Sequence, residues 1–296
     1  MMAPEECIVY TKSELDAMRQ AKTLLQDADF CQKHKRATAL NEKEISKRHL
    51  AITVLISKSR PEEAAMKYIQ WLQGLAVWGI EQFNDEQLTN PPKRSDHYLQ
   101  AYKLAGRDIN GTCIFWIDGK NSIPNDMEEE MFSTYAGIRY HMAVHSDART
   151  IREGLTFVID VTNKPKKKVG NERRLQGSHS SYPLRPQHIY IVGASKLVRV
   201  GINALLLIGG FVSKAKILKR IKFVTLDQVV DEQNGGTVPK QSLPKHLKRA
   251  ESLDNLIAMA NMKINEEKKD DAELTSNELV VEWVNQRISQ IPMPDI

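Results

Sequence analysis

Two histidines, His141 and His145, stand four residues apart in a stretch that predicts a helix, so their side chains share one helix face. A pair at this spacing can bind a metal ion when a third ligand is present, and a glutamate between the two can act as a base. No glutamate lies between these two, and the sequence indicates no third ligand. We therefore expect histidines on the surface or packed in the core, and we predict no metal site.

The other patterns that could support catalysis are incomplete. The glycine run Gly106–Thr112 lacks the lysine with which a phosphate-binding loop reaches its nucleotide. Asp160 ends an apolar run as a phosphoryl-accepting aspartate does, but Thr162 stands where a second acid is expected. Ser195 follows a glycine and an alanine, whereas a nucleophile elbow needs a glycine at the position of Leu197. These gaps predict a protein without catalytic residues, and so not an enzyme.

Positive charge is concentrated in one segment of the chain. The 296 residues carry a formal net charge of +5, but residues 163–222 hold fourteen lysines or arginines and one acid, Glu172. This asymmetry indicates an anionic partner: nucleic acid, a phospholipid surface or an acidic protein. No RNA-binding strand, zinc finger or helix-turn-helix accompanies the basic residues, so nucleic acid is the least supported partner and we do not expect it. A solvated loop at Lys164–Lys168 is the alternative that needs no partner.

The cysteines and the apolar runs bear on where the protein acts. Cys7, Cys31 and Cys113 are too few and too scattered for a disulfide framework, which favours a reducing compartment. The first seven residues carry two glutamates and lack the apolar core of a secretory signal. The longest nearly uncharged apolar run, Val200–Val212, is shorter than the ~20 residues that span a bilayer. We expect a cytoplasmic protein with peripheral membrane association.

Apolar residues recur at helical spacing in three stretches of the first ninety residues. Ser13 is the candidate N-cap of the first stretch, and the second begins near Asn41. The third has Pro61 in its first turn, followed by two glutamates at the positive end of the helix dipole. The segment Asn90-Pro91-Pro92 then breaks the series. We predict an N-terminal helical subdomain over residues 1–90.

Strand patterns alternate with helical patterns after this boundary. Strands are expected at Thr112–Ile117, Leu155–Val161, His188–Val192 and Ile221–Thr225. Asp126 and three glutamates begin a helix between the first two strands. The alternation predicts an α/β fold with a sheet covered by helices.

The segment Ala194–Gly210 predicts a helix that is apolar on most of its sides, so it is either buried or covers something apolar. A basic segment, Lys214–Arg220, follows this helix. In that segment Lys216 and Arg220 are four residues apart and share one predicted helix face. A last helix is expected near Glu278–Ile288, and the sequence leaves open whether it packs on the domain, binds a partner or forms a dimer.

Taken in order, these pieces resemble the CRAL-TRIO lipid-binding family, which includes retinaldehyde-binding, tocopherol-transfer and phosphatidylinositol-transfer proteins. The resemblance covers roughly residues 45–250 and lies in LAITVLISKSRPEEAAMKYIQWL, GRDINGTCIFWI, GLTFVIDV and the stretch from YPLRPQHIYIVGASK to IKFV. Its most specific piece is the Tyr182-Pro183 step with the strand, apolar helix and basic segment that follow. The implied organisation is a helical subdomain (1–90), a CRAL-TRIO domain (95–250) and a helical tail (251–296).

The resemblance implies a mixed β-sheet that floors a deep apolar pocket, with a helix from about Lys196 to Gly210 as a mobile gate. Apolar side chains of the strands and of the gate would line or close this pocket. The predicted lipid-pocket residues are Phe115, Ile117, Phe157, Ile159, Ile189, Ile191, Leu205, Leu206 and Phe211. Ordinary core packing is the alternative for each of them.

In the tocopherol and retinaldehyde subgroup, the resemblance implies phosphoinositide contacts at a basic residue after Pro-Leu and on the basic segment. In the phosphatidylinositol-transfer subgroup, the resemblance implies a further contact at the position of Lys58. The predicted headgroup and membrane residues are Lys58, Arg185, Lys216, Lys219 and Arg220. Each basic group near an anionic surface contributes ~1 kcal/mol to binding. A solvated face is the alternative.

The sequence therefore predicts a non-enzymatic protein that binds a hydrophobic lipid and transfers it between membranes or presents it. Contact with phosphoinositide-containing or other anionic membranes would run through the basic face. No cofactor is expected apart from the bound lipid. The alternative function is a regulatory interaction module, with a small GTPase or a signalling enzyme as partner and a pocket filled by the protein's own side chains.

Overall fold

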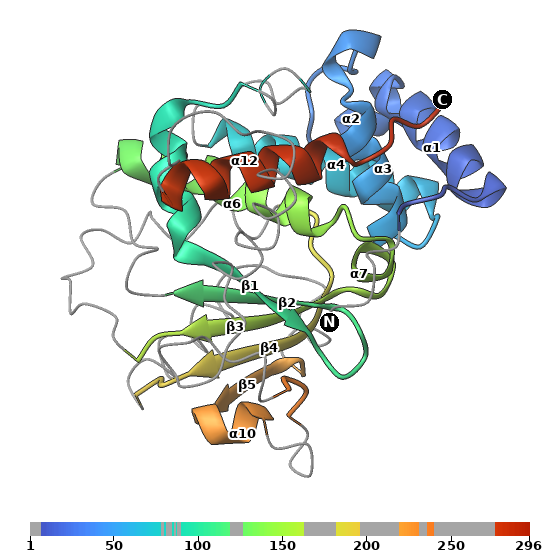
Figure 1. Cartoon of the computed structure of the whole chain (residues 1–296). Helices are drawn as coiled ribbons and strands as arrows, with labels where there is room; N and C mark the ends of the chain where they lie inside the picture. The colour runs from blue at the N-terminus through green and yellow to red at the C-terminus, as the bar shows by residue number, and fades with distance from the viewer. Residues whose placement is uncertain are drawn as a thin grey trace, which may run out of the picture.

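The computed structural model describes residues 7–77, 80, 85, 87, 90–118, 127–162, 182–195, 219–230, 236–239 and 276–296. These residues form a mixed α/β fold in which a five-stranded sheet lies beneath helices from both ends of the chain (Figure 1). The α/β class predicted from the sequence is confirmed at this level.

Helices near the N-terminus gather on one side of the molecule (Figure 1). They are α1 (Lys12–Leu25), α2 (Ala28–Lys33), α3 (Lys47–Ile56) and α4 (Pro61–Ala76), with a 3-10 turn η1 (Glu42–Glu44) before α3. The N-cap of α1 is Thr11 and not the predicted Ser13, because Thr11 and Glu14 form a capping box. The amide of Glu14 donates to Thr11 Oγ1 at 3.2 Å, and the amide of Thr11 donates to the Glu14 carboxylate at 2.8 Å. Pro61 opens α4 as expected.

The strands are neighbours in the sheet in the same order as in the chain. They are β1 (Tyr102–Arg107), β2 (Cys113–Asp118), β3 (Leu155–Asp160), β4 (Pro186–Val192) and β5 (Ile221–Val224). β1 pairs antiparallel with β2, and the other pairs are parallel. The four predicted strands are confirmed, whereas β1 was not expected. The structure places β1 at one edge of the sheet, after the 3-10 helix η2 (Lys93–Ala101).

The connection between β2 and β3 consists of α6 (Met127–Val144) and α7 (Ala148–Glu153). The ring of His141 on α6 stacks on Phe115 of β2 at 4.5 Å between centroids and lies 5.9 Å from Phe157 of β3. We call this side of the sheet its helix face. Side chains alternate along a strand, so Ile114 and Trp116 point to the opposite face, where they join a smaller core with α10 (Leu226–Val230).

The last helix, α12 (Ser276–Ser289), crosses α6 and packs against α6 and η2 (Figure 1). The guanidinium of Arg139, on α6, is almost fully buried and donates to Asp96 at 2.6 Å and to Asn285 of α12 at 2.7 Å. The hydroxyl of Tyr10 donates to the carbonyl of Pro292 at 2.7 Å, so the two ends of the described chain are joined. Residues 276–296 therefore pack on the domain.

The described residues contain no helix that is long and apolar enough to cross a membrane. Within the same part of the chain, no group of histidine, cysteine and acidic side chains is arranged to hold a metal ion. The three cysteines are free thiols, with Cys31 and Cys113 buried and Cys7 exposed.

Candidate functional site

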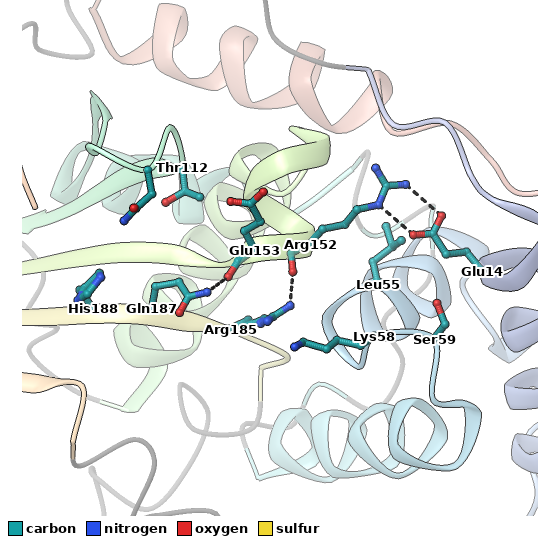
Figure 2. Close-up of a pocket in the computed structure, with 11 residues that line it drawn as sticks. Glu14, Leu55, Lys58, Ser59, Thr112, Arg152, Glu153, Arg185, Gln187 and His188 are labelled. Carbon is teal, nitrogen blue, oxygen red and sulfur yellow. Dashed lines mark hydrogen bonds and ion pairs between the residues drawn. The ribbon is translucent and has the colours of Figure 1, made fainter.

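A cavity of about 700 Å³ lies between the N-terminal helices and the end of the sheet at which strands β3 and β4 begin (Figure 2). The side chains that line the cavity come from five places in the chain. These are α1, the end of α3 with the turn after it, the β1–β2 turn, α7, and β4 with the residue before this strand. Most of these side chains are polar or charged. Lys58 and Arg185, two of the predicted headgroup residues, are both among them.

Lys58 reaches the cavity from an unusual turn between α3 and α4. Both Lys58 and Ser59 have positive φ angles, 55° and 56°, which non-glycine residues adopt infrequently. The turn is held because the amide of Lys58 donates to the Leu55 carbonyl at 3.1 Å and the amide of Ser59 donates to the Val54 carbonyl at 3.0 Å. The ammonium group of Lys58 forms no ion pair with any residue that the structure describes.

Arg185 is fixed by the start of the parallel sheet. Its carbonyl accepts from the amide of Leu155 at 2.9 Å, and its guanidinium donates to the carbonyl of Arg152. Gly154 makes this close approach possible: its φ angle is 111°, and a Cβ atom there would collide with the Arg185 carbonyl. The backbone around β3 and β4 thus holds the Arg185 side chain in the cavity wall.

Arg220 lies close to Arg185 and donates to the carbonyl of Pro186. Burial lowers the pKa of the Arg185 guanidinium, and the neighbouring charge of Arg220 lowers it further. Arg185 and Arg220 form no ion pair within the described ranges. We call Lys58, Arg185 and Arg220 the cationic cluster. Such a cluster of unpaired cations attracts anions, and arginine suits phosphate or carboxylate oxygens in particular.

The other arginine that lines the cavity, Arg152, is already neutralised by Glu14. Its guanidinium donates to the two carboxylate oxygens of Glu14 at 2.9 and 3.0 Å and to the Val9 carbonyl at 2.8 Å. Burial raises the pKa of Glu14, but hydrogen bonds from Arg152 and Thr11 outweigh this effect and hold it below its usual range. This pair joins α7 to the N-terminal segment, and it leaves Lys58 and Arg185 as the lining cations that form no ion pair within the described residues.

The opposite end of the cavity is polar, and Figure 2 shows it around Thr112, Glu153 and His188. The carboxylate of Glu153 pairs with Arg149 at 3.4 Å. Burial lowers the pKa of His188, which keeps its ring neutral near pH 7. Asn110 and Gln187 complete this end. The cavity therefore combines the cations Lys58 and Arg185 with polar groups that can form hydrogen bonds, which suits an anionic group on a molecule that also carries hydroxyl groups.

The structure brings together the predicted lipid-pocket residues that it describes. Strand register pairs Phe115 with Phe157 and Phe157 with Ile189, and pairs Ile117 with Ile159 and Ile159 with Ile191. These two apolar rows lie on the helix face, and β5 continues them with Ile221 and Phe223. The predicted gate, with Leu205, Leu206 and Phe211, and the predicted headgroup residue Lys216 lie outside the described residues. Lys219 is exposed beside Arg220.

Burial differs along these apolar rows. Phe115 and Phe157, 0% and 6% exposed, belong to the main core beneath α6. Ile191 is also buried, whereas Ile117, Ile159 and Ile189 are half-buried. The two β5 side chains, Ile221 and Phe223, are half-buried as well. The apolar surface of the helix face thus extends from the packed core under α6 toward β5.

Three histidines surround Tyr182 in the core, a cluster that the sequence did not reveal. The ring of Tyr182 lies 6.0 Å from His49 of α3, 5.3 Å from His141 and 6.3 Å from His145. His141 and His145 are packed in the core, which confirms the expectation of surface or packed histidines. Burial lowers the pKa of His49 and of His145 to about 3, and both rings are therefore neutral. The cluster joins the segments that carry Lys58, Arg152 and Arg185.

A scan against protein-family models found no match for this chain, and a search of curated proteins also found none. Among the residues that the structure describes, the cavity and the apolar rows are the features on which a proposal of function can rest.

Proposed function

We propose that this chain is a non-enzymatic lipid-binding protein of the CRAL-TRIO type. It holds a hydrophobic ligand against the helix face of its sheet and contacts a phosphoinositide-containing membrane through the cavity. The observation that carries the proposal is the convergence of Lys58 and Arg185, which are distant in the sequence, on one cavity. Arg220, a third residue of the predicted headgroup site, lies beside Arg185.

The chemistry of the cavity suits a phosphorylated polyol headgroup. Phosphate oxygens would accept hydrogen bonds from the cationic cluster, and this pairing would relieve the repulsion that lowers the pKa of Arg185. Ring hydroxyls would meet the polar side chains at the other end, Asn110, Gln187 and His188. A simple anionic surface would need only the charges, so these polar side chains favour an inositol headgroup.

The burial of the apolar rows supports a hydrophobic ligand on the helix face. Phe115 and Phe157 are packed under α6, whereas Ile117, Ile159 and Ile189 are only half-buried. A hydrophobic ligand would cover the part of these isoleucines that is still exposed. The predicted gate residues Leu205, Leu206 and Phe211 lie outside the described residues, and their closing of the pocket stays a prediction.

Charge reversal tests the headgroup assignment. The double variant Lys58→Glu, Lys219→Glu is expected to weaken binding to phosphoinositide vesicles by about 30-fold or more, since each lost cation removes ~1 kcal/mol. Both side chains are exposed, so the fold should persist. The measurement is co-sedimentation with vesicles of phosphatidylcholine and phosphatidylinositol bisphosphate.

The matched control is Lys33→Glu, Lys43→Glu, which changes the net charge equally at two other exposed lysines. We expect this control to bind nearly as wild type does. Equal losses in both variants would mean that net charge alone drives binding, and unchanged binding of the Lys58 and Lys219 variant would refute the headgroup site.

One observation favours a second function, a regulatory interaction module for a small GTPase or a signalling enzyme. Phe115 and Phe157, two predicted pocket residues, pack fully against the protein's own side chains in the main core. If the rest of the apolar rows is filled in the same way, no lipid enters, and the cationic cluster would bind an acidic partner instead.

A further inference from the structure

Four large apolar side chains are exposed on the part of the molecule that the structure describes. They are Val9 (76% exposed), Val77 (62%), Ile109 (52%) and Met293 (48%). Single exposed apolar residues are ordinary on a protein surface, so their positions decide whether they have a role. Two of them, Val9 and Ile109, adjoin residues that line the cavity.

Val9 lies at the Glu14 end of the cavity. Its carbonyl accepts from Arg152, whose guanidinium lines the cavity together with Glu14. The next residue, Tyr10, is fixed by its hydrogen bond to Pro292, and the preceding residue, Ile8, is buried in the main core, so the segment is held on both sides of Val9. The exposed side chain of Val9 is thus attached to an ordered backbone.

Ile109 lies at the other end, in the turn between β1 and β2. The carboxylate of Asp108 accepts from the amide of Asn110 at 2.9 Å and from the amide of Thr112 at 3.0 Å. It also accepts from the hydroxyl of Thr156 at 2.7 Å, and the amide of Ile109 donates to the Thr237 carbonyl at 3.1 Å. These hydrogen bonds fix the conformation of the turn. The apolar side chain of Ile109 is therefore held in a solvent-exposed position at the tip of the turn.

Figure 2 shows Thr112 and Glu14 at opposite ends of the cavity, with Lys58 and Arg185 between them. Val9 and Ile109 therefore adjoin the two ends of the cavity, and Lys58 and Arg185 lie between these ends. A membrane interface can bind both kinds of group. Apolar side chains enter the boundary of the acyl chains, while cations stay among the anionic headgroups.

We infer that the mouth of the cavity docks on an anionic bilayer, with Val9 and Ile109 inserted as apolar anchors on either side of the cationic cluster. This inference rests on the proposed membrane contact and adds its orientation and its anchoring residues. The partner at this surface is the bilayer. An acidic protein would also match the positive charge, but its binding would not require two separate apolar anchors.

An environment-sensitive fluorophore at single cysteines tests this orientation in the full-length chain. In a Cys7→Ser background, the label is attached to Val9→Cys, Ile109→Cys or the control Val77→Cys. The native thiols of Cys31 and Cys113 do not compete, because burial raises their pKa, that of Cys113 to about 12. The vesicles contain phosphatidylcholine, phosphatidylserine and phosphatidylinositol bisphosphate, with or without brominated acyl chains.

On these vesicles, the labels at positions 9 and 109 are expected to shift to shorter wavelength and to be quenched by the brominated chains, while the label at 77 stays unchanged. If the protein co-sediments with the vesicles but the labels at 9 and 109 behave like the label at 77, the docking orientation is wrong and the proposed function stands. If the unlabelled wild type does not bind the vesicles, the inference and the proposed membrane contact fail together.

Serine variants give a second, label-free readout. Val9→Ser and Ile109→Ser are each expected to weaken vesicle binding about tenfold, and Val77→Ser to leave it unchanged. All three should melt at the wild-type temperature, since the side chains are exposed. Wild-type vesicle affinity of the Val9→Ser, Ile109→Ser double variant would overturn the inference.

Discussion

Replacing Trp283 by alanine is expected to lower the free energy of unfolding by about 3–5 kcal/mol. Trp283 is 9% exposed on α12, and its ring lies 5.6 Å from the ring of Tyr140 on α6. The loss of this side chain leaves a void between two packed helices, and the hydrogen bond from the buried Arg139 to Asn285 hinders its collapse. The measurement is urea unfolding, with the slope of the transition unchanged and the midpoint lowered.

Ser289→Ala is the matched control on the same helix. Ser289 is exposed, and its hydroxyl bonds only to the neighbouring backbone, so we expect a change below about 0.5 kcal/mol. A Trp283→Ala variant as stable as this control would show that α12 does not contribute to the core. α6 covers two aromatic side chains of the sheet, Phe115 and Phe157. The same result would therefore also mean that α12 does not stabilise the packing of α6 on these side chains.

The free energy of unfolding is expected to fall steeply as the pH drops below about 6.5. His49 and His145 have a pKa of about 3 in the folded protein because they are buried, whereas unfolded histidine takes up its proton near pH 6.5. Below that pH the unfolded chain binds more protons than the folded one, so stability is full above 6.5 and is lost toward pH 3. Each histidine contributes a slope of ~1.4 kcal/mol per pH unit.

Other groups affect the same titration less between pH 6.5 and 5. His188 is half-buried with a lowered pKa, so it adds a smaller loss of the same sign. The lowered pKa values of Glu14 and Asp147 remove stability only at more acidic pH, where unfolded carboxylates become protonated. The histidines therefore dominate the upper part of the range.

A His145→Phe variant separates the contribution of one ring. Phenylalanine keeps a flat ring beside Tyr182 but cannot bind a proton, so we expect about half of the slope between pH 6 and 5 to disappear. Urea unfolding at a series of pH values measures this slope. An unchanged slope would contradict the assignment of the acid sensitivity to the buried histidines.

Local patterns in the sequence predicted most of the sheet. The strands β2, β3 and β4 are short runs of β-branched and aromatic residues, and such runs are stable when both faces of a sheet are covered. β1 has no such run, because Lys103 and Gly106 interrupt it and it gains its place only by pairing with β2. Similarly, the sequence predicted Ser13 as the N-cap of α1, and the reciprocal contact between Thr11 and Glu14 makes Thr11 the N-cap instead.

The site could be predicted only in part, because its parts come from distant segments. Lys58 and Arg185 were suggested by the resemblance to a family and not by any local pattern. The pairing of Arg152 with Glu14 and the packing of Tyr182 among three histidines depend on how the segments meet in space. Thr112 lines the cavity because its turn is held by Asp108, and nothing in the sequence indicated this position.

The central claim, that the sheet holds a hydrophobic ligand, is tested most directly by native mass spectrometry of the purified full-length protein. Organic extraction and identification of the released material would follow. The proposal predicts a lipid or another hydrophobic molecule bound at one copy per chain. A protein that is empty as purified and stays empty after incubation with mixed lipids would contradict it and would favour the interaction module.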